Sequence, residues 1–203
     1  MKTCLYATLL FILTLQTSAN AALDAWQNSS LGDWFVASNW TFEIGVPTAT
    51  TDVEIGTGGT ALINAPNAVA QAFLIGVPTS SAATTGSVIL GASGGSRGSL
   101  TVSSEIDIGA SSVAGRVANG TVTVSAGTSL KQESGNLYIG FGNQGSTGRL
   151  TITDPGSIMS TAAPTFIGLG NSHGNFTVQN GGAISTGPAE SANDASSGAV
   201  QRR

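Results

Sequence analysis

Three short apolar runs, Gly120-Thr-Val-Thr-Val124, Gly127-Thr-Ser-Leu130 and Leu137-Tyr-Ile-Gly140, follow one another with turns between them. The same order returns as Gly148-Arg-Leu-Thr-Ile152, Gly156-Ser-Ile158 and Thr165-Phe-Ile-Gly168. We call them the opening, middle and closing runs. The opening glycine stands 20 residues before the closing glycine in both copies. Such a repeat is typical of a supersecondary unit that buries its apolar face by stacking on its neighbours. The sequence therefore predicts an all-β fold, a single parallel β-solenoid.

Composition agrees with stacked short strands. Of 203 residues, 40% are hydrophobic, only 9% are charged and 28 are glycine. A typical globular domain has about 25% charged residues. The formal net charge is −4 and the basic residues are scattered, so nucleic acid is not an expected partner, because its phosphates require a basic surface.

The N-terminus is typical of a signal peptide covering residues 1–21. Lys2 precedes an apolar stretch, Leu5–Leu15, and Ala19-Asn-Ala21 matches a cleavage site. The stretch is too short for a retained transmembrane helix, and no second one occurs. We therefore expect a secreted or cell-surface protein. The single cysteine, Cys4, lies inside this segment, so we expect no disulfide, metal or cofactor in the mature chain.

Residues 22–50 hold all three tryptophans, Trp26, Trp34 and Trp40. Bulky side chains in an atypical terminal unit can close the open end of a solenoid, so we interpret this region as an N-terminal cap. The alternative is that Trp34 and Trp40 stack on sugars. The solenoid repeats then occupy residues 51–187, and residues 188–203 read as a disordered or thin tail.

Part of the chain resembles a known family. The motif consists of Trp34-Phe-Val-Ala-Ser-Asn-Trp40, Val46-Pro47 and Asp52-Val-Glu-Ile55, followed by the glycine-rich repeats. It is similar to the N-terminal part of bacterial autotransporter-type passenger proteins. The resemblance implies an exported, surface-associated, right-handed three-sided β-helix. It also implies a C-terminal translocator barrel, which has no counterpart before Arg203.

Alternation along the strands predicts which side chains face outward. Taking Gly98-Ser-Leu-Thr-Val102 as another opening run, we expect an outward threonine column, Thr101, Thr123, Thr151 and Thr177. Ile106-Asp-Ile-Gly109 would then close that coil without a middle run. Threonine suits an exposed strand through its β-propensity. The alternative is an ice-binding face. Such a face needs a second regular row of threonines beside the first, and the side chains next to this column are irregular.

The closing runs predict a second outward column, Glu54, Leu74, Asp107, Tyr138 and Phe166. Stacked Tyr138 and Phe166 either stabilise the ladder or, with Asp107, form a ligand or partner surface. The segments 110–119 and 141–147 differ in length between coils, and variable segments are where recognition is expected in a solenoid.

Signs of catalysis are few. Glu105 and Asp107 lie on the same side of a strand and could form a carboxylate pair, as in polysaccharide lyases or glycoside hydrolases. Asp154-Pro-Gly156 is explained as a turn, and the single histidine, His173, as a turn residue. We expect no catalytic residues. The sequence favours an exported, non-catalytic surface or passenger-type protein that contacts cell-surface or matrix glycans or proteins. The alternative is a secreted polysaccharide-binding or polysaccharide-degrading protein.

Overall fold

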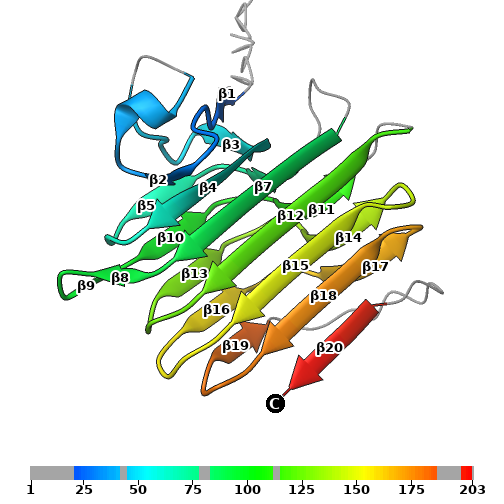
Figure 1. Ribbon diagram of the computed structural model, residues 1–203. Coiled ribbons are helices and arrows are strands. Elements are labelled where there is room, and N and C mark those ends of the chain that lie inside the picture. Colours follow the sequence, from blue (N-terminus) through cyan, green and yellow to red (C-terminus); the bar gives the residue numbers. More distant parts are fainter. Residues whose placement is uncertain (1–20, 42–44, 78–82, 112–114, 187–197, 203) are drawn as a thin grey trace, which may run out of the picture.

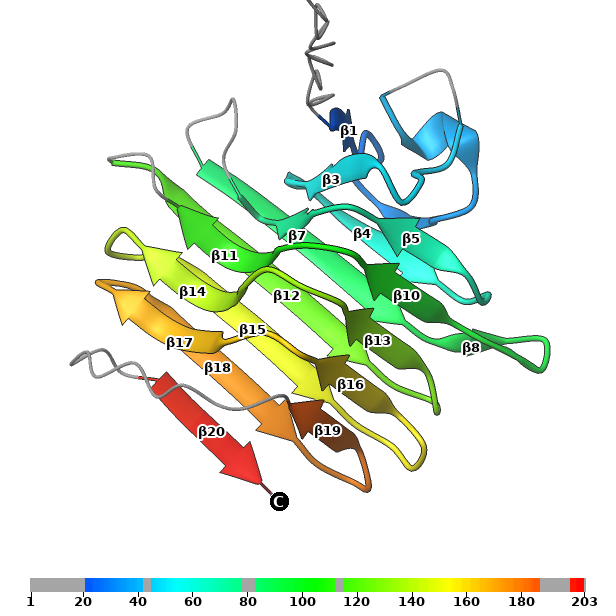
Figure 2. The same ribbon diagram turned by 180° about the vertical axis from the view of Figure 1, so that it is seen from behind.

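The structure, a computed structural model, describes residues 21–41, 45–77, 83–111, 115–186 and 198–202. The predicted signal peptide lies outside these residues, apart from Ala21. In the described residues, successive coils of the chain stack on one another. Their strands pair into three parallel sheets of seven, five and six strands, as Figures 1 and 2 show. We name them the opening, middle and closing sheets after the runs that form them.

The opening sheet contains β2 (Leu31–Asp33), β4 (Thr57–Ile63), β7 (Ala83–Leu90), β12 (Val117–Val124), β15 (Thr147–Ile152), β18 (His173–Val178) and β20 (Gly198–Arg202). The middle sheet contains β5 (Ala68–Ala70), β10 (Ser99–Val102), β13 (Ser129–Gln132), β16 (Ile158–Thr161) and β19 (Ala183–Thr186). The closing sheet contains β1 (Ala22–Ala25), β3 (Thr51–Ile55), β6 (Phe73–Ile75), β11 (Ile106–Ser111), β14 (Leu137–Gly142) and β17 (Thr165–Gly170). The chain passes from opening to middle to closing sheet and then starts the next coil. The predicted parallel β-solenoid is confirmed, and its right-handed sense stays a prediction.

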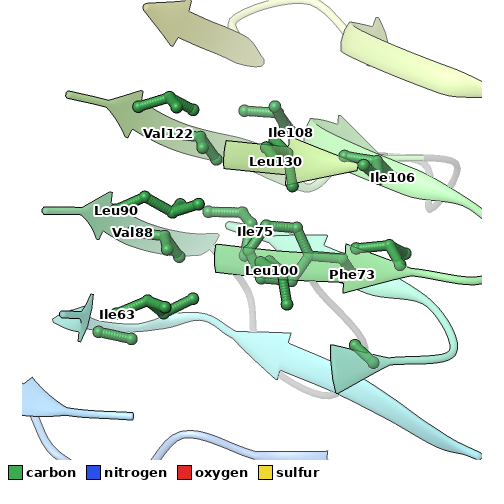
Figure 3. Close-up of a cluster of buried hydrophobic side chains, with 14 of the residues drawn as sticks. Ile63, Phe73, Ile75, Val88, Leu90, Leu100, Ile106, Ile108, Val122 and Leu130 are labelled. Carbon is green, nitrogen blue, oxygen red and sulfur yellow. The ribbon is translucent and has the colours of Figure 1, made fainter. Parts of the chain in front are cut away.

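The core is a column of aliphatic side chains enclosed by the three sheets. Val88 and Val122 come from the opening sheet, Leu100 and Leu130 from the middle sheet and Ile108 from the closing sheet (Figure 3). Each is 1% exposed or less. Full burial of such a side chain contributes roughly 1.5–3 kcal/mol. The predicted inward faces of the strands are therefore confirmed, and this repeated burial holds the coils together.

Glycines mark the corner where each closing strand leads into the next opening strand. Gly140 has a φ of +69°, and a Cβ there would lie 2.2 Å from the carbonyl oxygen of His173. A Cβ on Gly148 would lie 2.1 Å from the backbone nitrogen of Gly140. Backbone therefore packs directly on backbone at this corner, which explains why glycine recurs in every copy.

One predicted column needs correction. Thr123, Thr151 and Thr177 are in register in the opening sheet. Thr101 instead lies in the middle sheet, between Val69 and Lys131. β7, β10 and β11 are the opening, middle and closing strands of the coil that contains Thr101. The prediction that this coil skips its middle run is therefore wrong. Short apolar runs of β10 and β12 look alike in sequence, and only pairing shows which sheet each belongs to.

The middle run of the second copy is shifted by one residue from the sequence alignment. Leu130 pairs with Met159 and not with Ile158. Met159 is fully buried, whereas Ile158 is 39% exposed. The turn before β16 is one residue longer than its counterpart, and the turn after it is one residue shorter. The two differences in turn length cancel, so the distance from the opening to the closing glycine is the same in both copies and does not reveal the shift.

The tryptophans form a buried cluster. Trp26, Trp34 and Trp40 are 0%, 0% and 3% exposed. Trp40 makes edge-to-face contacts with Trp26 and Trp34 at centroid distances of 4.9 and 4.8 Å, and Trp34 lies 6.2 Å from Phe73 of β6. A buried ring offers no face to a sugar, so Trp34 and Trp40 do not form a ligand surface. Their role as a cap stays a prediction.

Both ends of the chain add strands to the sheets. In the segment 22–50, which includes the 3₁₀ helix η1 (Ala37–Asn39), β1 and β2 pair with β3 and β4. This segment is therefore built into the first coil. In the tail, β20 pairs in parallel with β18, as the thin-tail alternative and not the disordered one implies for residues 198–202. Residues 187–197 lie outside the described residues.

One insertion interrupts the coils. The segment 91–98 contains a small antiparallel pair, β8 (Ala92–Ser93) and β9 (Ser96–Arg97). Gly94 and Gly95 have φ angles of +57° and +85°, as the tightest hairpin turns require. The pair projects from the stacked coils in Figure 1 and leaves the three sheets unchanged.

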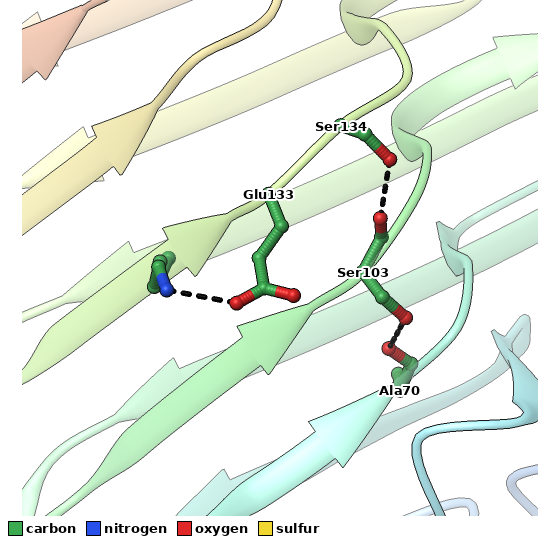
Figure 4. A network of polar contacts seen from close by, with 5 residues as sticks. Ala70, Ser103, Glu133 and Ser134 are labelled. Atoms are coloured by element: carbon green, nitrogen blue, oxygen red, sulfur yellow. Dashed lines mark hydrogen bonds and ion pairs between the residues drawn. The ribbon is translucent and has the colours of Figure 1, made fainter.

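Serines link successive coils beside the middle sheet (Figure 4). Ser103 Oγ donates to the Ala70 carbonyl at 3.3 Å, and Ser134 Oγ donates to the Ser103 carbonyl. Lys131 and Glu133 form an ion pair at 2.8 Å nearby. Both of its side chains are about half exposed, so it contributes little to stability. The hydroxyls therefore satisfy carbonyl oxygens at the ends of these short strands.

Candidate functional site

The second predicted column is confirmed on the outer face of the closing sheet. Asp107 lies in register with Leu74 on one side and Tyr138 on the other, and Tyr138 with Phe166. Leu74 lies in turn in register with Glu54. Two of the predicted ligand residues, Asp107 and Tyr138, are therefore direct neighbours.

A cavity of about 200 Å³ opens beside Asp107; we call it the slot. Asp107 and Ala110 of β11 pair with Tyr138 and Phe141 of β14, so two small side chains lie next to two large ones. The slot is the space that the small pair leaves unfilled. Its lining residues are Val77, Glu105, Asp107, Ala110, Tyr138 and Phe141.

Aromatic rings form one wall of the slot. Tyr138 stacks on Phe166 at a centroid distance of 5.1 Å and an interplanar angle of 18°, and Phe141 lies 5.0 Å from Tyr138. Asn136 Nδ2 donates to the Tyr138 hydroxyl at 3.0 Å and holds the ring in place. Because Phe166 covers one face of Tyr138, the other face is turned toward the neighbouring coil, where Asp107 lies.

The other wall carries two carboxyl groups, Glu105 and Asp107, which we call the carboxylate pair. Burial, the negative charge of Glu105 and a hydrogen bond with Glu105 together raise the pKa of Asp107 to about 7. Asp107 Oδ1 is buried and has no hydrogen-bond partner among the described residues. Asp107 therefore holds its proton up to near neutral pH.

The remaining predicted residues lie elsewhere. Thr123, Thr151 and Thr177 belong to the opening sheet, and Trp34 and Trp40 to the buried cluster. Asp154 has a φ of +75° and accepts a hydrogen bond from the Ala126 backbone nitrogen at 3.0 Å, as its interpretation as a turn residue implies.

Sequence reasoning missed Phe141, Ala110 and Val77 as site residues. Strict alternation from Tyr138 places Phe141 on the inner face. The left-handed conformation of Gly140 interrupts that alternation, so Tyr138 and Phe141 share the outer face. Gly109 does the same for Ala110, with a φ of +64°. The usable signal was length variation, because Ala110 and Phe141 begin the two segments that differ between coils.

Two searches of the described residues were negative. Across these ranges no three side chains of the metal-binding types come together. The helical part of the same residues includes nothing long and apolar enough to cross a membrane. Comparisons with protein-family models, curated proteins and solved structures give no match to this chain.

Proposed function

We propose that this chain is an exported, non-catalytic surface protein of the passenger type, whose slot binds one sugar unit of a cell-surface or matrix glycan. The observation that carries the proposal is that the aromatic ring of Tyr138 and the carboxylate pair line the same cavity of about 200 Å³. An aromatic face accepts the apolar face of a sugar ring, and carboxylate oxygens accept hydrogen bonds from its hydroxyls. Export is supported by the N-terminal sequence and the family resemblance.

The placement of the two carboxyl groups favours binding over hydrolysis. Glycoside hydrolases flank the scissile bond with two carboxyl groups about 5 Å or more apart. Glu105 and Asp107 instead lie side by side, close enough for the charge of Glu105 to raise the pKa of Asp107. A sugar in the slot would therefore meet both groups from one side.

The test is glycan binding by the mature chain, starting at Ala22, measured by calorimetry against neutral and charged oligosaccharides. We expect Tyr138→Ala to weaken binding about tenfold or more, because an aromatic platform is lost. Thr123→Ala, on the opening sheet, is the matched control and should bind as the wild type does. Circular dichroism should show both variants folded.

Two results would contradict the proposal: no oligosaccharide bound at millimolar concentration, or a folded Tyr138→Ala chain with unchanged affinity. New reducing ends in the same mixtures would favour the degrading alternative.

A further inference from the structure

We infer that the sugar unit selected by the slot carries a free, protonated amino group, so that the ligand class is amino sugars. This inference rests on the proposed function. It concerns which glycan binds, and it comes from the charges and donors that line the slot.

The slot offers negative charge. Of the described residues that line it, two carry carboxyl groups and none is basic. The ion pair of Lys131 with Glu133 lies on the middle sheet. A neutral sugar would leave the carboxylate pair without a counter-charge, whereas an ammonium group would supply one.

The hydrogen-bond inventory favours the same ligand. An ammonium group has three donors and no acceptor, and a carboxylate pair has only acceptors once Asp107 has lost its proton. Asp107 Oδ1, which is buried and has no hydrogen-bond partner among the described residues, is the acceptor that such a donor would reach. A hydrogen bond between two charged groups is about twice as strong as one between neutral groups. When the ammonium group binds, the proton held by Asp107 leaves for solvent, so one positive charge replaces another beside this carboxyl group.

The aromatic wall adds a second attraction. A cation within about 6 Å of a ring centroid is attracted by the ring face. Tyr138 and Phe141, whose ring centroids are 5.0 Å apart, both line the slot together with Asp107. The wall that stacks on the sugar ring therefore also favours a positive substituent on it.

Three 1,4-linked tetrasaccharides separate the possibilities, because they differ in the substituent at one carbon of each ring: glucosamine, N-acetylglucosamine and glucose. At pH 7 in moderate salt we expect the glucosamine tetramer to bind about tenfold or more tightly than the other two. This difference in affinity corresponds to one additional hydrogen bond between charged groups in the glucosamine complex. We expect this preference to disappear in Asp107→Asn, which removes the charge while keeping the shape.

Non-specific attraction of a cation to an acidic protein is controlled by Glu133→Gln. This variant removes the same charge at an exposed site on the middle sheet and should keep the preference. Equal binding of all three tetramers overturns the inference and leaves the proposed function standing. Loss of the preference in Glu133→Gln, or its survival in Asp107→Asn, also overturns the inference. Binding of none of the three contradicts both.

Discussion

Single residues decide the chemistry of the closing sheet. Asp107 occupies a position that Leu74 and Tyr138 fill in the neighbouring coils. A carboxyl group in that partly buried place costs stability when it is charged, because burial disfavours ionisation. Natural sequences accept such costs chiefly at functional sites. This is the reason for assigning a binding role to Asp107 and its neighbour Glu105 and not to the other acidic residues.

The raised pKa of Asp107 predicts how stability changes with pH. The group titrates near pH 7 when folded and near 3.8 when unfolded, so between these values the folded chain binds the proton more tightly. This contribution to stability is complete below about pH 4, is lost as the pH rises through 7, and amounts to a few kcal/mol at most. Among the residues lining the slot, Glu105 is the other carboxyl group. Urea unfolding at pH 5, 6 and 8 measures the effect.

In Asp107→Asn this fall in stability should disappear, because the amide does not titrate. If wild type and variant lose stability equally between pH 5 and pH 8, the assignment to Asp107 is wrong.

The corner glycines predict a steric effect separate from backbone strain. Gly140→Ala should lower the free energy of unfolding by more than 3 kcal/mol, the upper end of the strain expected from a positive φ alone, because its Cβ would collide with the His173 carbonyl. Gly94→Ala is the control. Its φ is also positive, at +57°, but nothing lies within 4 Å of the added Cβ. Chemical denaturation compares the two, and equal losses would show that strain alone requires glycine.

Elements are positioned by pairing between coils, and their own sequences leave the register open. β13 and β16 illustrate this, since Leu130 pairs with Met159 although Ile158 has the matching spacing. A shift of one residue moves every side chain to the other face. The buried thioether of Met159 and the exposed side chain of Ile158 are the outcome. Register in this solenoid therefore depends on how each turn distributes its residues.

β13 also carries a buried polar side chain, and we expect its replacement to lower the free energy of unfolding. Gln132 is 2% exposed and donates to the carbonyl oxygens of Ser104 and Asn136 at 3.0 and 2.9 Å, while Thr161 Oγ1 donates to it at 2.9 Å. Gln132→Met keeps the shape but leaves these groups unsatisfied. We expect a loss of about 1–3 kcal/mol in thermal or urea unfolding.

Lys131→Met is the matched control, because Lys131 is the neighbouring side chain and is 56% exposed. It should cost less than about 1 kcal/mol. A Gln132→Met chain as stable as this control would mean that the buried network does not stabilise the middle sheet.

At the scale of the whole molecule, each coil is stabilised by its neighbours, so the first and last coils lack one partner. At the N-terminal end, Trp34 packs between Trp40 and Phe73. At the other end, Ile167, Val178 and Ile184 are only half buried. The tryptophan cluster is therefore the feature that distinguishes the two ends.

The capping role of the cluster predicts a large effect of Trp34→Ala. Removing a fully buried tryptophan should lower the free energy of unfolding by about 3–5 kcal/mol and speed amide exchange in β3 and β6. Leu31→Ala, in the same segment but with a side chain that is 62% exposed, should change little. If amide exchange in β3 and β6 is the same in Trp34→Ala and wild type, the cluster does not close the end of the solenoid.

The sequence by itself determined the solenoid, the inward aliphatic columns and the outward line from Asp107 to Phe166. Strand alternation and coil spacing are local and repeat along the chain, so they can be read without coordinates. Only the tertiary structure decided that Thr101 belongs to another sheet, because sheet membership depends on pairing between distant residues. It also decided the slot itself. The left-handed backbone at Gly140 rotates Phe141 onto the outer face, and alternation alone carries no information about that rotation.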